Sequence, residues 1–215
     1  MSGADLSRIV AIVPVRSLSG AKSRLGEPLD PEERADLILA MLRRTVEAAM
    51  ASRRLHGVAV VSLDAELLAQ ARAMGAASLL QLSDGLNEGL AETRDSACHE
   101  ATALLVLPAD LPGVTAEAID RLAEVAEATS ARAPGRAVVV LVSDRHGTGT
   151  NALLVAPPDA IEFRFGEGSR AAHAAEAAAA GATYVELDGP LSFDVDTPED
   201  LLEADSGGLD HEAGR

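Results

Sequence analysis

The chain has 215 residues and a formal net charge of −16, and 47% of its residues are hydrophobic but only 2% aromatic. This length suits one domain whose core is built from Ala, Val, Leu and Ile. The charge disfavours binding to nucleic acid. The sequence has neither the run of about 20 apolar residues of a membrane span nor an export signal. A single cysteine excludes an intrachain disulfide. We therefore expect a cytoplasmic protein without a membrane partner.

The first half of the chain alternates between strand and helix patterns. Residues 8–15 (RIVAIVPV) are a short β-branched run that predicts a buried strand. Asp30-Pro31-Glu32-Glu33 is typical of a helix start, and apolar residues at three- and four-residue spacing continue to Ala49. The pattern then predicts a strand at 58–61, a helix at about 65–74 that ends at Gly75, a strand at 78–80 and a helix at 86–100.

The second half continues this alternation. Residues 103–107 (ALLVL) predict a central strand, and Thr115 is expected to cap a helix that runs to about Ala128. Thr197-Pro198-Glu199-Asp200 predicts the start of a last helix. Further elements are expected as strands at 137–142, 152–156 and 183–187 and as a helix at about 169–180. We expect one domain over residues 1–205, followed by a polar, Gly-rich tail at 206–215.

This order of elements predicts an α/β protein with a Rossmann-like layered fold. Strands that alternate with helices form an open, mostly parallel sheet with helices on both faces. In such folds, ligands bind beyond the carboxyl ends of the strands. The residues that follow the predicted strands are therefore the first candidates for a functional site.

Three acids stand at predicted strand ends. Asp110 follows the most hydrophobic strand, and Asp194 and Asp196 are two residues apart, so in an extended chain their side chains point the same way. Mg²⁺ prefers oxygen ligands, usually one or two carboxylates together with substrate phosphates. The alternative is that Asp194 and Asp196 cap a turn or the following helix. Two acids at this spacing, with a third at another strand end, favour the magnesium site.

The loop after the first strand carries three of the few basic residues, Arg16, Lys22 and Arg24, together with Gly20. A nucleotide triphosphate commonly lies at this position of an open α/β sheet. The loop has neither the P-loop pattern nor Gly-x-Gly-x-x-Gly, which disfavours a dinucleotide dehydrogenase. Its alternative is a solvated basic turn.

Two glycine-containing motifs could bind another anion. The sequence DRHGTGTNALL, at 144–154, contains repeated glycines that would let the backbone approach a ligand closely. The sequence FRFGEGS, at 163–169, precedes a helix whose N-terminal N–H groups favour negative charge. An ordinary helix cap at Ser169 explains the second motif equally well. His146 and His173 are interpreted as structural, since no catalytic triad order is present.

These motifs together resemble a known family. IVPVRSLSGAKSRL, LPADLP, DRHGTGTNALL, FRFGEGS and FDVDTPEDL have the order and spacing found in the guanylyltransferases of coenzyme F420 biosynthesis, over about residues 8–203. Those enzymes, the 2-phospho-L-lactate and phosphoenolpyruvate guanylyltransferases, have the nucleotidyltransferase-like α/β fold. They convert GTP and a phosphorylated three-carbon acid into a guanylated product and pyrophosphate.

The resemblance implies roles for residues of this chain. Thr150, Gly166 and Ser169 match positions that bind the phosphorylated acid. Asp110, Asp194 and Asp196 match acids that hold Mg²⁺ in the catalytic centre, and the loop with Lys22 and Arg24 matches the region that faces the triphosphate. Arg16 is a departure, because many relatives have lysine there, and arginine contacts phosphate with a different geometry. The resemblance also suggests a homodimer.

The acceptor acid stays open at this point. Phosphoenolpyruvate, 2-phospho-L-lactate and 3-phosphoglycerate differ by little more than a double bond or a hydroxyl group, and the Ala- and Arg-rich composition favours phosphoenolpyruvate. One rival hypothesis is a nucleotidyltransferase for a sugar phosphate or a molybdopterin-type cofactor, although its usual Gly-Gly-x-Gly-x-x-x-Arg start is missing. Another is a non-catalytic nucleotide-binding module, which the three acids disfavour.

Overall fold

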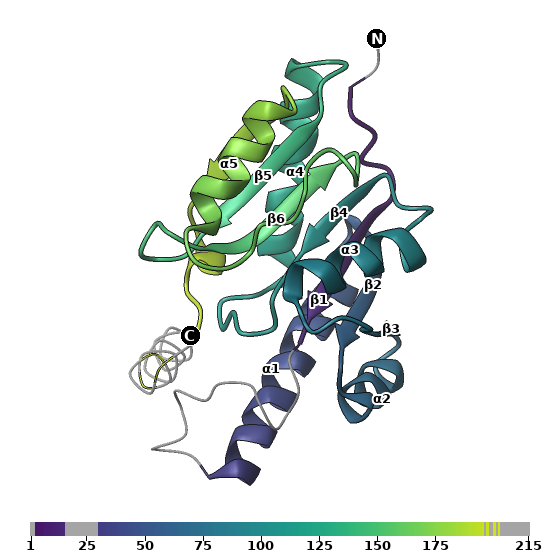
Figure 1. The fold of residues 1–215 in the computed structure, drawn as a ribbon, viewed down its shortest axis with the longest axis vertical. Coiled ribbons are helices and arrows are strands. Elements are labelled where there is room, and N and C mark those ends of the chain that lie inside the picture. Colours follow the sequence, from purple (N-terminus) through teal and green to yellow (C-terminus); the bar gives the residue numbers. More distant parts are fainter. Residues whose placement is uncertain (1–2, 16–29, 196, 198–199, 201, 203–215) are drawn as a thin grey trace, which may run out of the picture.

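The computed structural model describes residues 3–15, 30–195, 197, 200 and 202, and the elements follow the predicted order (Figure 1). The strands are β1 (Ile9–Pro14), β2 (Leu55–Ser62), β3 (Ala77–Leu80), β4 (Ala103–Val106), β5 (Val138–Ser143), β6 (Thr150–Ala156) and β7 (Thr183–Leu187). The helices are α1 (Pro31–Ala51), α2 (Ala65–Ala73), α3 (Leu86–Ala97), α4 (Ala116–Arg132), α5 (Ser169–Ala179) and the short 3₁₀ helix η2 (Pro190–Ser192).

The strands form one seven-stranded sheet in the order β3-β2-β1-β4-β6-β5-β7. The β3–β2, β2–β1, β1–β4 and β5–β7 pairs are parallel, whereas β6 is antiparallel to both of its neighbours. The predicted mostly parallel α/β sheet is thus confirmed. The exception arises because β5 and β6 are joined by a turn, without the crossover helix that a parallel pair needs.

Local sequence signals explain where the helices begin and end. The Asp30 carboxylate accepts hydrogen bonds from the N–H groups of Glu32 and Glu33, while the Glu33 carboxylate accepts from the Asp30 N–H. This is the predicted capping box of α1. Thr115 caps α4 by accepting from the Ala118 N–H, and α2 is followed by Gly75 at φ +90°. These three predictions are confirmed.

Helices cover both faces of the sheet, and each face has its own apolar core (Figure 1). Side chains of α1, α2 and α4 pack on one face, and those of α3 and α5 pack on the other. Strand alternation divides the sheet residues between them: Leu105 of β4 belongs to the first core, and Leu104 and Val106 belong to the second. The two cores are therefore mainly aliphatic, as the low aromatic content predicted, with Phe163 as a buried aromatic residue of the second.

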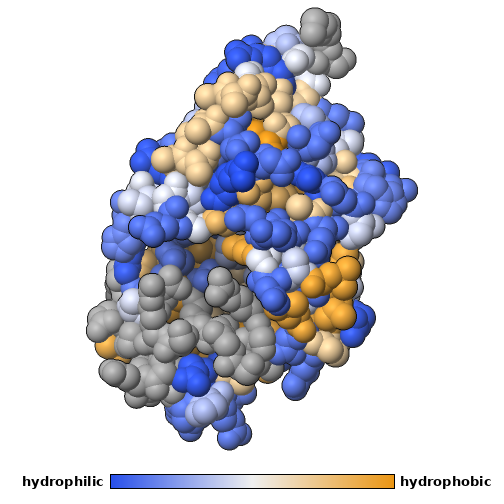
Figure 2. Space-filling model, in the orientation of Figure 1, coloured by the Kyte–Doolittle hydropathy of each residue, from blue (hydrophilic) through white to orange (hydrophobic). Residues whose placement is uncertain are grey.

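Hydrophilic and hydrophobic side chains are mixed on the face seen in Figure 2, and a hydrophobic patch lies near β3, where Leu80 and Leu82 are exposed. Among the described residues, no helix is both long and apolar enough to cross a membrane. At the predicted last helix, the Thr197 N–H donates to Asp200 Oδ2 over 2.7 Å, which is a capping contact. The predicted tail at 206–215 lies outside the described residues.

Candidate active site

Most of the segments that the sequence predicts to form the functional site lie at the carboxyl edge of the sheet. The strands β1, β4, β5 and β7 end at this edge, and β6 begins there because it runs in the opposite direction. Asp110 therefore follows β4, Thr150 opens β6, and Asp194 lies on the segment that follows β7. Ligands of open α/β sheets bind beyond this edge.

Asp110 and Asp194 lie on two segments that are joined through their backbones. The Val195 N–H donates to the Asp110 carbonyl over 3.0 Å. Both aspartates are half-buried, whereas Val195 is buried. The structure thus brings together two of the three acids that were predicted to share a metal ion. The third, Asp196, lies outside the described residues.

Two buried polar side chains hold these segments in place. Asn151 of β6 donates its side-chain amide to the Leu191 carbonyl (3.1 Å) and to Asp194 Oδ1 (3.2 Å). Thr45 of α1 donates its hydroxyl to the Ala109 carbonyl over 3.2 Å. Because buried polar groups must be hydrogen-bonded to offset their desolvation, these contacts fix the segments in one arrangement.

The two acidic segments also approach each other closely at Gly113. A Cβ atom at this position would collide with the backbone carbonyl of Pro190. The absence of a side chain is therefore what lets the segment after β4 pack against η2.

The turn between β5 and β6 forms hydrogen bonds to the side-chain carboxylate of its own residue Asp144. The Thr148 N–H donates to Asp144 Oδ1 over 2.8 Å, and a Cβ on Gly149 would lie 2.7 Å from Asp144 Oδ2. Burial acts to raise the pKa of Asp144, but hydrogen bonds from Gly149 and Thr148 and the charge of His146 outweigh burial and lower it. Part of the glycine-rich backbone is thus occupied by the Asp144 carboxylate. Thr150 is a separate candidate, at the start of β6.

The FRFGEGS segment turns sharply into α5. Gly166 (φ +127°) and Gly168 (φ +70°) adopt backbone conformations that favour glycine. Ser169, the first residue of α5, is 1% exposed, and its N–H donates to the Gly166 carbonyl over 3.1 Å. From α3, the Asn87 side chain accepts from the Phe165 N–H (2.8 Å) and donates to the Phe165 carbonyl (3.0 Å).

Thr150 and the FRFGEGS segment, which hold the residues predicted to bind the acceptor, both contact His173 of α5. Its Nδ1 lies 3.1 Å from Thr150 Oγ1, and its Nε2 accepts from the Arg164 N–H over 2.9 Å. Arg164 is two residues before Gly166, and His173 is one helical turn after Ser169. Thr150, Gly166 and Ser169 thus belong to one connected part of the structure, although they come from a strand, a loop and a helix.

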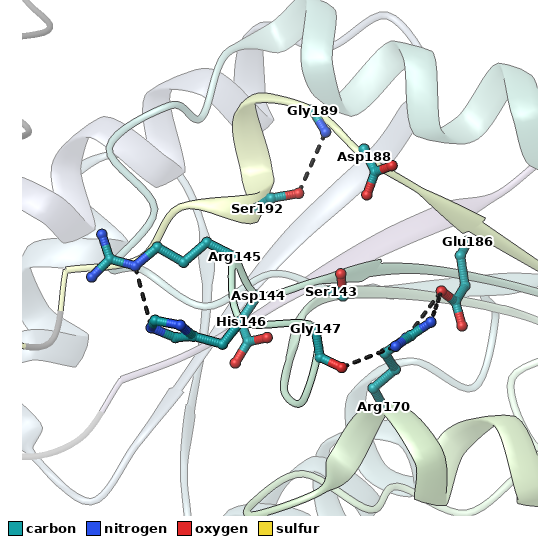
Figure 3. A pocket seen from close by; sticks show the side chains of 10 residues that line it. All are labelled: Ser143, Asp144, Arg145, His146, Gly147, Arg170, Glu186, Asp188, Gly189 and Ser192. Carbon is teal, nitrogen blue, oxygen red and sulfur yellow. Dashed lines mark hydrogen bonds and ion pairs between the residues drawn. The ribbon is translucent and has the colours of Figure 1, made fainter.

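A pocket of about 550 Å³ opens beside the β5–β6 turn (Figure 3). Arg145 and His146 lie on one side, and Arg170 and Glu186 form an ion pair (2.8 Å) on the other. Hydrogen bonds from Arg170 and then Tyr184 lower the pKa of Glu186. The volume lies in the range of small-molecule sites. The lining residues are Ser143, Asp144, Arg145, His146, Gly147, Arg170, Glu186, Asp188, Gly189 and Ser192.

The acidic residues fit Mg²⁺ better than a metal held by protein alone. Within the described part of the chain, no cluster of three or more His, Cys, Asp or Glu residues is placed to hold a metal ion. Asp110 and Asp194 lie on two segments joined by a backbone hydrogen bond, and the Asn151 amide orients one oxygen of Asp194. Two carboxylates completed by substrate phosphates are a usual magnesium site.

The predicted nucleotide-binding residues Arg16, Lys22 and Arg24 lie outside the described residues. Sequence reasoning did not anticipate the contacts of Asn87, Asn151 and His173. A lone asparagine or histidine carries no periodic or spacing signal. The nearest signal for His173 was its position one turn after the FRFGEGS motif, on the helix that this motif begins.

Comparison with known proteins identifies the family. Residues 9–213 match the model of the family described as guanylyl transferase CofC like. The chain is 46% identical over 196 residues to a phosphoenolpyruvate guanylyltransferase of Sphaerobacter thermophilus, a match covering 90% of this chain and 91% of the relative. It is also 46% identical over 211 residues to the protein of the same name from Rubrobacter xylanophilus, with 96% and 98% covered.

Solved structures are similar in fold at low identity. A putative nucleotide-diphospho-sugar transferase from Desulfovibrio desulfuricans is 15% identical with a TM-score of 0.70, covering 91% of this chain and 85% of that one. A nucleotidyl transferase from Methanothermobacter is 18% identical with a TM-score of 0.66, covering 95% and 99%. These likenesses confirm the nucleotidyltransferase-like fold. Because the family match spans nearly the whole chain, the protein belongs to the CofC-like guanylyl transferase family.

Proposed function

We propose that this enzyme transfers GMP from GTP to the phosphate of phosphoenolpyruvate and releases pyrophosphate, as a step in coenzyme F420 biosynthesis. The observation that carries the proposal is the meeting, at one sheet edge, of Asp110 and Asp194 with the segments that hold Thr150 and Ser169. The 46% identity to two phosphoenolpyruvate guanylyltransferases supports the choice of acceptor.

Asp110, Asp194 and Asp196 are the proposed magnesium ligands. Bound Mg²⁺ would supply positive charge that offsets the phosphates and the developing charge on pyrophosphate. The chain's own contribution is to hold the carboxylates, through the Val195 N–H to the Asp110 carbonyl and the Asn151 amide to Asp194. Fixed carboxylates need no reorganisation when the nucleotide binds.

Thr150, Gly166 and Ser169 are the proposed binding residues for the acceptor, and Arg16, Lys22 and Arg24 for the nucleotide triphosphate. Two of the acceptor residues, Thr150 and Ser169, are 8% and 1% exposed. Near-complete burial lets neutral hydrogen-bond donors act in a low-dielectric setting, where each is worth more than in water. The basic loop would balance the remaining phosphate charge.

The proposed chemistry requires no general base from the chain. An oxygen of the acceptor phosphate, already an anion, attacks the α-phosphorus of GTP. The bond between this phosphorus and the oxygen that bridges to the β-phosphate breaks, and pyrophosphate leaves with the electron pair. The task of the protein is to align two polyanions and stabilise the departing charge. A site built from acids, backbone groups and buried hydroxyls, with its histidine held in a structural contact, suits this task.

The test is pyrophosphate release from GTP and Mg²⁺ with phosphoenolpyruvate, 2-phospho-L-lactate and 3-phosphoglycerate in separate reactions. We expect release with phosphoenolpyruvate and weaker release with the other two acids. ATP and CTP serve as nucleotide controls, and glucose 1-phosphate tests the sugar-phosphate alternative. Coupling to the next F420 enzyme removes the guanylated product as it forms. Silence with all three acids, despite measurable GTP binding, would overturn the proposed acceptor.

Three accompanying properties are also proposed: a cytoplasmic location, the absence of a nucleic-acid partner, and the homodimer that the family resemblance suggests. The net charge of −16 supports the second, because an acidic surface repels a phosphate backbone. Light scattering on the purified chain measures the oligomeric state, and a monomer at assay concentration would contradict the dimer.

A further inference from the structure

His173 is a completely buried histidine directly beside a proposed acceptor-binding residue. It is 0% exposed, and both ring nitrogens have partners: Nδ1 lies 3.1 Å from Thr150 Oγ1, and Nε2 lies 2.9 Å from the backbone nitrogen of Arg164. The ring also packs edge-on against Phe165, with centroids 4.9 Å apart. These contacts hold the imidazole in one orientation between β6, the FRFGEGS segment and α5.

The contact with Arg164 determines which nitrogen carries the proton. A backbone N–H can only donate, so Nε2 of His173 must accept with its lone pair. A neutral imidazole with an unprotonated Nε2 carries its hydrogen on Nδ1. Burial lowers the pKa of His173 to about 4, although the charge of Glu176 and a hydrogen bond to the Ser169 backbone act in the opposite direction, so the ring is neutral near pH 7. The geometry and the burial thus agree on the Nδ1–H tautomer.

This tautomer determines the direction of the Thr150 hydroxyl. Because Nδ1 carries a hydrogen, it cannot accept one, and Thr150 Oγ1 therefore acts as the acceptor in the 3.1 Å contact. The hydroxyl hydrogen of Thr150 must then point away from His173. Thr150 opens β6 at the carboxyl edge of the sheet, where ligands of open α/β sheets bind.

We propose that His173 is a positioning residue that fixes the Thr150 hydroxyl as a hydrogen-bond donor toward an anionic oxygen of the acceptor acid. The inference rests on the proposed function, because it takes the acceptor to bind at Thr150. It adds the reason why a threonine suits this position. A free hydroxyl can donate or accept, whereas one held by an Nδ1–H presents its hydrogen to a carboxylate or phosphate oxygen. The site therefore favours an acceptor that offers a lone pair.

Two substitutions of His173 separate its two contacts. The side-chain amide of Asn reaches about as far as Nδ1, so His173→Asn retains a donor toward Thr150. The oxygen of Gln reaches about as far as Nε2, so His173→Gln retains an acceptor for the Arg164 N–H but loses the donor. We expect His173→Gln to raise the KM for phosphoenolpyruvate about tenfold, with the KM for GTP unchanged. His173→Asn should stay closer to wild type. Exposed His99 provides the matched control, and His99→Gln should change neither constant.

A double-mutant cycle with Thr150→Val tests whether His173 acts through the hydroxyl. Valine keeps the shape of threonine and removes the oxygen. If His173 positions that oxygen, His173→Gln should add little to the KM of the Thr150→Val enzyme. Equal and independent effects of the two substitutions on the phosphoenolpyruvate KM would overturn the proposal, as would an unchanged KM in Thr150→Val alone. The unfolding midpoint of every variant is measured in parallel, since a purely structural role would lower it without this dependence between the two sites.

The tautomer can also be measured in the wild-type protein, where no variant has to fold. ¹⁵N-labelled imidazole resonances distinguish a protonated Nδ1 from a protonated Nε2, and we expect His173 to show the Nδ1–H form at neutral pH. An Nε2–H form would overturn the inference even if the enzyme is active. Conversely, a wild-type enzyme that binds GTP but turns over no acceptor would overturn the proposed function. The two failures are therefore distinguishable.

Discussion

Two groups of residues at the same edge of the sheet are held in opposite ways. The acceptor cluster, consisting of Thr150, Ser169 and His173, is neutral and at most 8% exposed. The acidic pair, Asp110 and Asp194, is half-buried and positioned through backbone and amide contacts. Full burial of a carboxylate would cost several kcal/mol (on the order of the penalty for an unpaired ion) and would favour its protonation. Neutral donors can be buried more completely, which makes them more rigid. A neutral group can therefore be buried without a charged partner, whereas the buried carboxylate of Asp200 is paired with Arg145.

Removing a charge from the acidic pair gives the largest expected effect. We expect Asp194→Asn and Asp110→Asn each to lower kcat/KM by at least about 100-fold, because the proposed metal loses a ligand. The free energy of unfolding should change by less than about 1 kcal/mol, since neither side chain is part of the core. Steady-state kinetics and urea unfolding measure the two quantities.

Asp159 supplies the control for this prediction, since it is an exposed acid in the turn after β6, at the opposite edge of the sheet. Asp159→Asn should have wild-type activity. Near-normal turnover by Asp194→Asn at saturating Mg²⁺ would contradict the magnesium assignment. The acidic pair would then no longer differ from the acceptor cluster in function.

The second prediction separates the two acidic segments without changing an acid. The new Cβ of Gly113→Ala would collide with the Pro190 carbonyl, so the segments after β4 and β7 must move apart. We expect a loss of about 1–3 kcal/mol in stability and a rise in the Mg²⁺ concentration needed for half-maximal activity. Gly57→Ala is the matched control, because a Cβ at that position meets no atom within 4 Å. An unchanged Mg²⁺ requirement would show that the distance between these segments does not limit metal binding.

The burial of His173 in the acceptor cluster should make the folding stability of the protein depend on pH. His173 has a pKa of about 4 in the folded chain against 6.5 ordinarily, chiefly because of burial, with Glu176 raising the pKa and Arg164 lowering it. Between these values the unfolded chain binds a proton that the folded chain does not. Stability is therefore fully present above about pH 6.5 and declines as the pH falls toward about 4. The contribution is at most about 1.4 kcal/mol per pH unit.

Urea unfolding at closely spaced pH values across this window measures the slope for wild type and for His173→Gln. The variant lacks the titrating group, so its stability should decline less steeply with acid than that of wild type. Other acids contribute to both proteins and cancel in the difference. Parallel slopes would mean that His173 is not buried as a neutral residue, and the contrast with the acidic pair would then fail.

Much of the fold could be predicted because its signals are local. The Asp30 capping box, the Thr115 cap and the alternation of strand and helix patterns each lie within a few neighbouring residues, and each is confirmed. The placement of Asp110 and Asp194 at one edge followed from the strand-end rule for parallel sheets. The antiparallel direction of β6 was not predicted, although the short connection between β5 and β6, which leaves no room for a crossover helix, indicates it.

The supporting contacts of the site could not be predicted because they join distant positions. Asn87 is 78 residues from Phe165, and His173 is 23 residues from Thr150. A single side chain with no periodic partner gives no indication of which backbone group it will meet in the fold. The roles of all the site residues stay predictions, and Arg16, Lys22, Arg24 and Asp196 lie outside the described residues.

The smallest expected effect concerns Arg164, which takes part in the acceptor cluster with its backbone and in a surface ion pair with its side chain. The backbone N–H donates to His173 Nε2, whereas the guanidinium contacts Glu176 at 2.8 Å with 53% of the arginine side chain exposed. Exposed ion pairs contribute little, because water and salt screen them. We expect Arg164→Ala to change the KM for phosphoenolpyruvate by less than about twofold, far less than His173→Gln, which disturbs the buried side of the same contact. A shift in KM as large as that of His173→Gln would place the guanidinium itself at the acceptor. The acceptor site would then include a charged, exposed side chain in addition to the buried neutral residues.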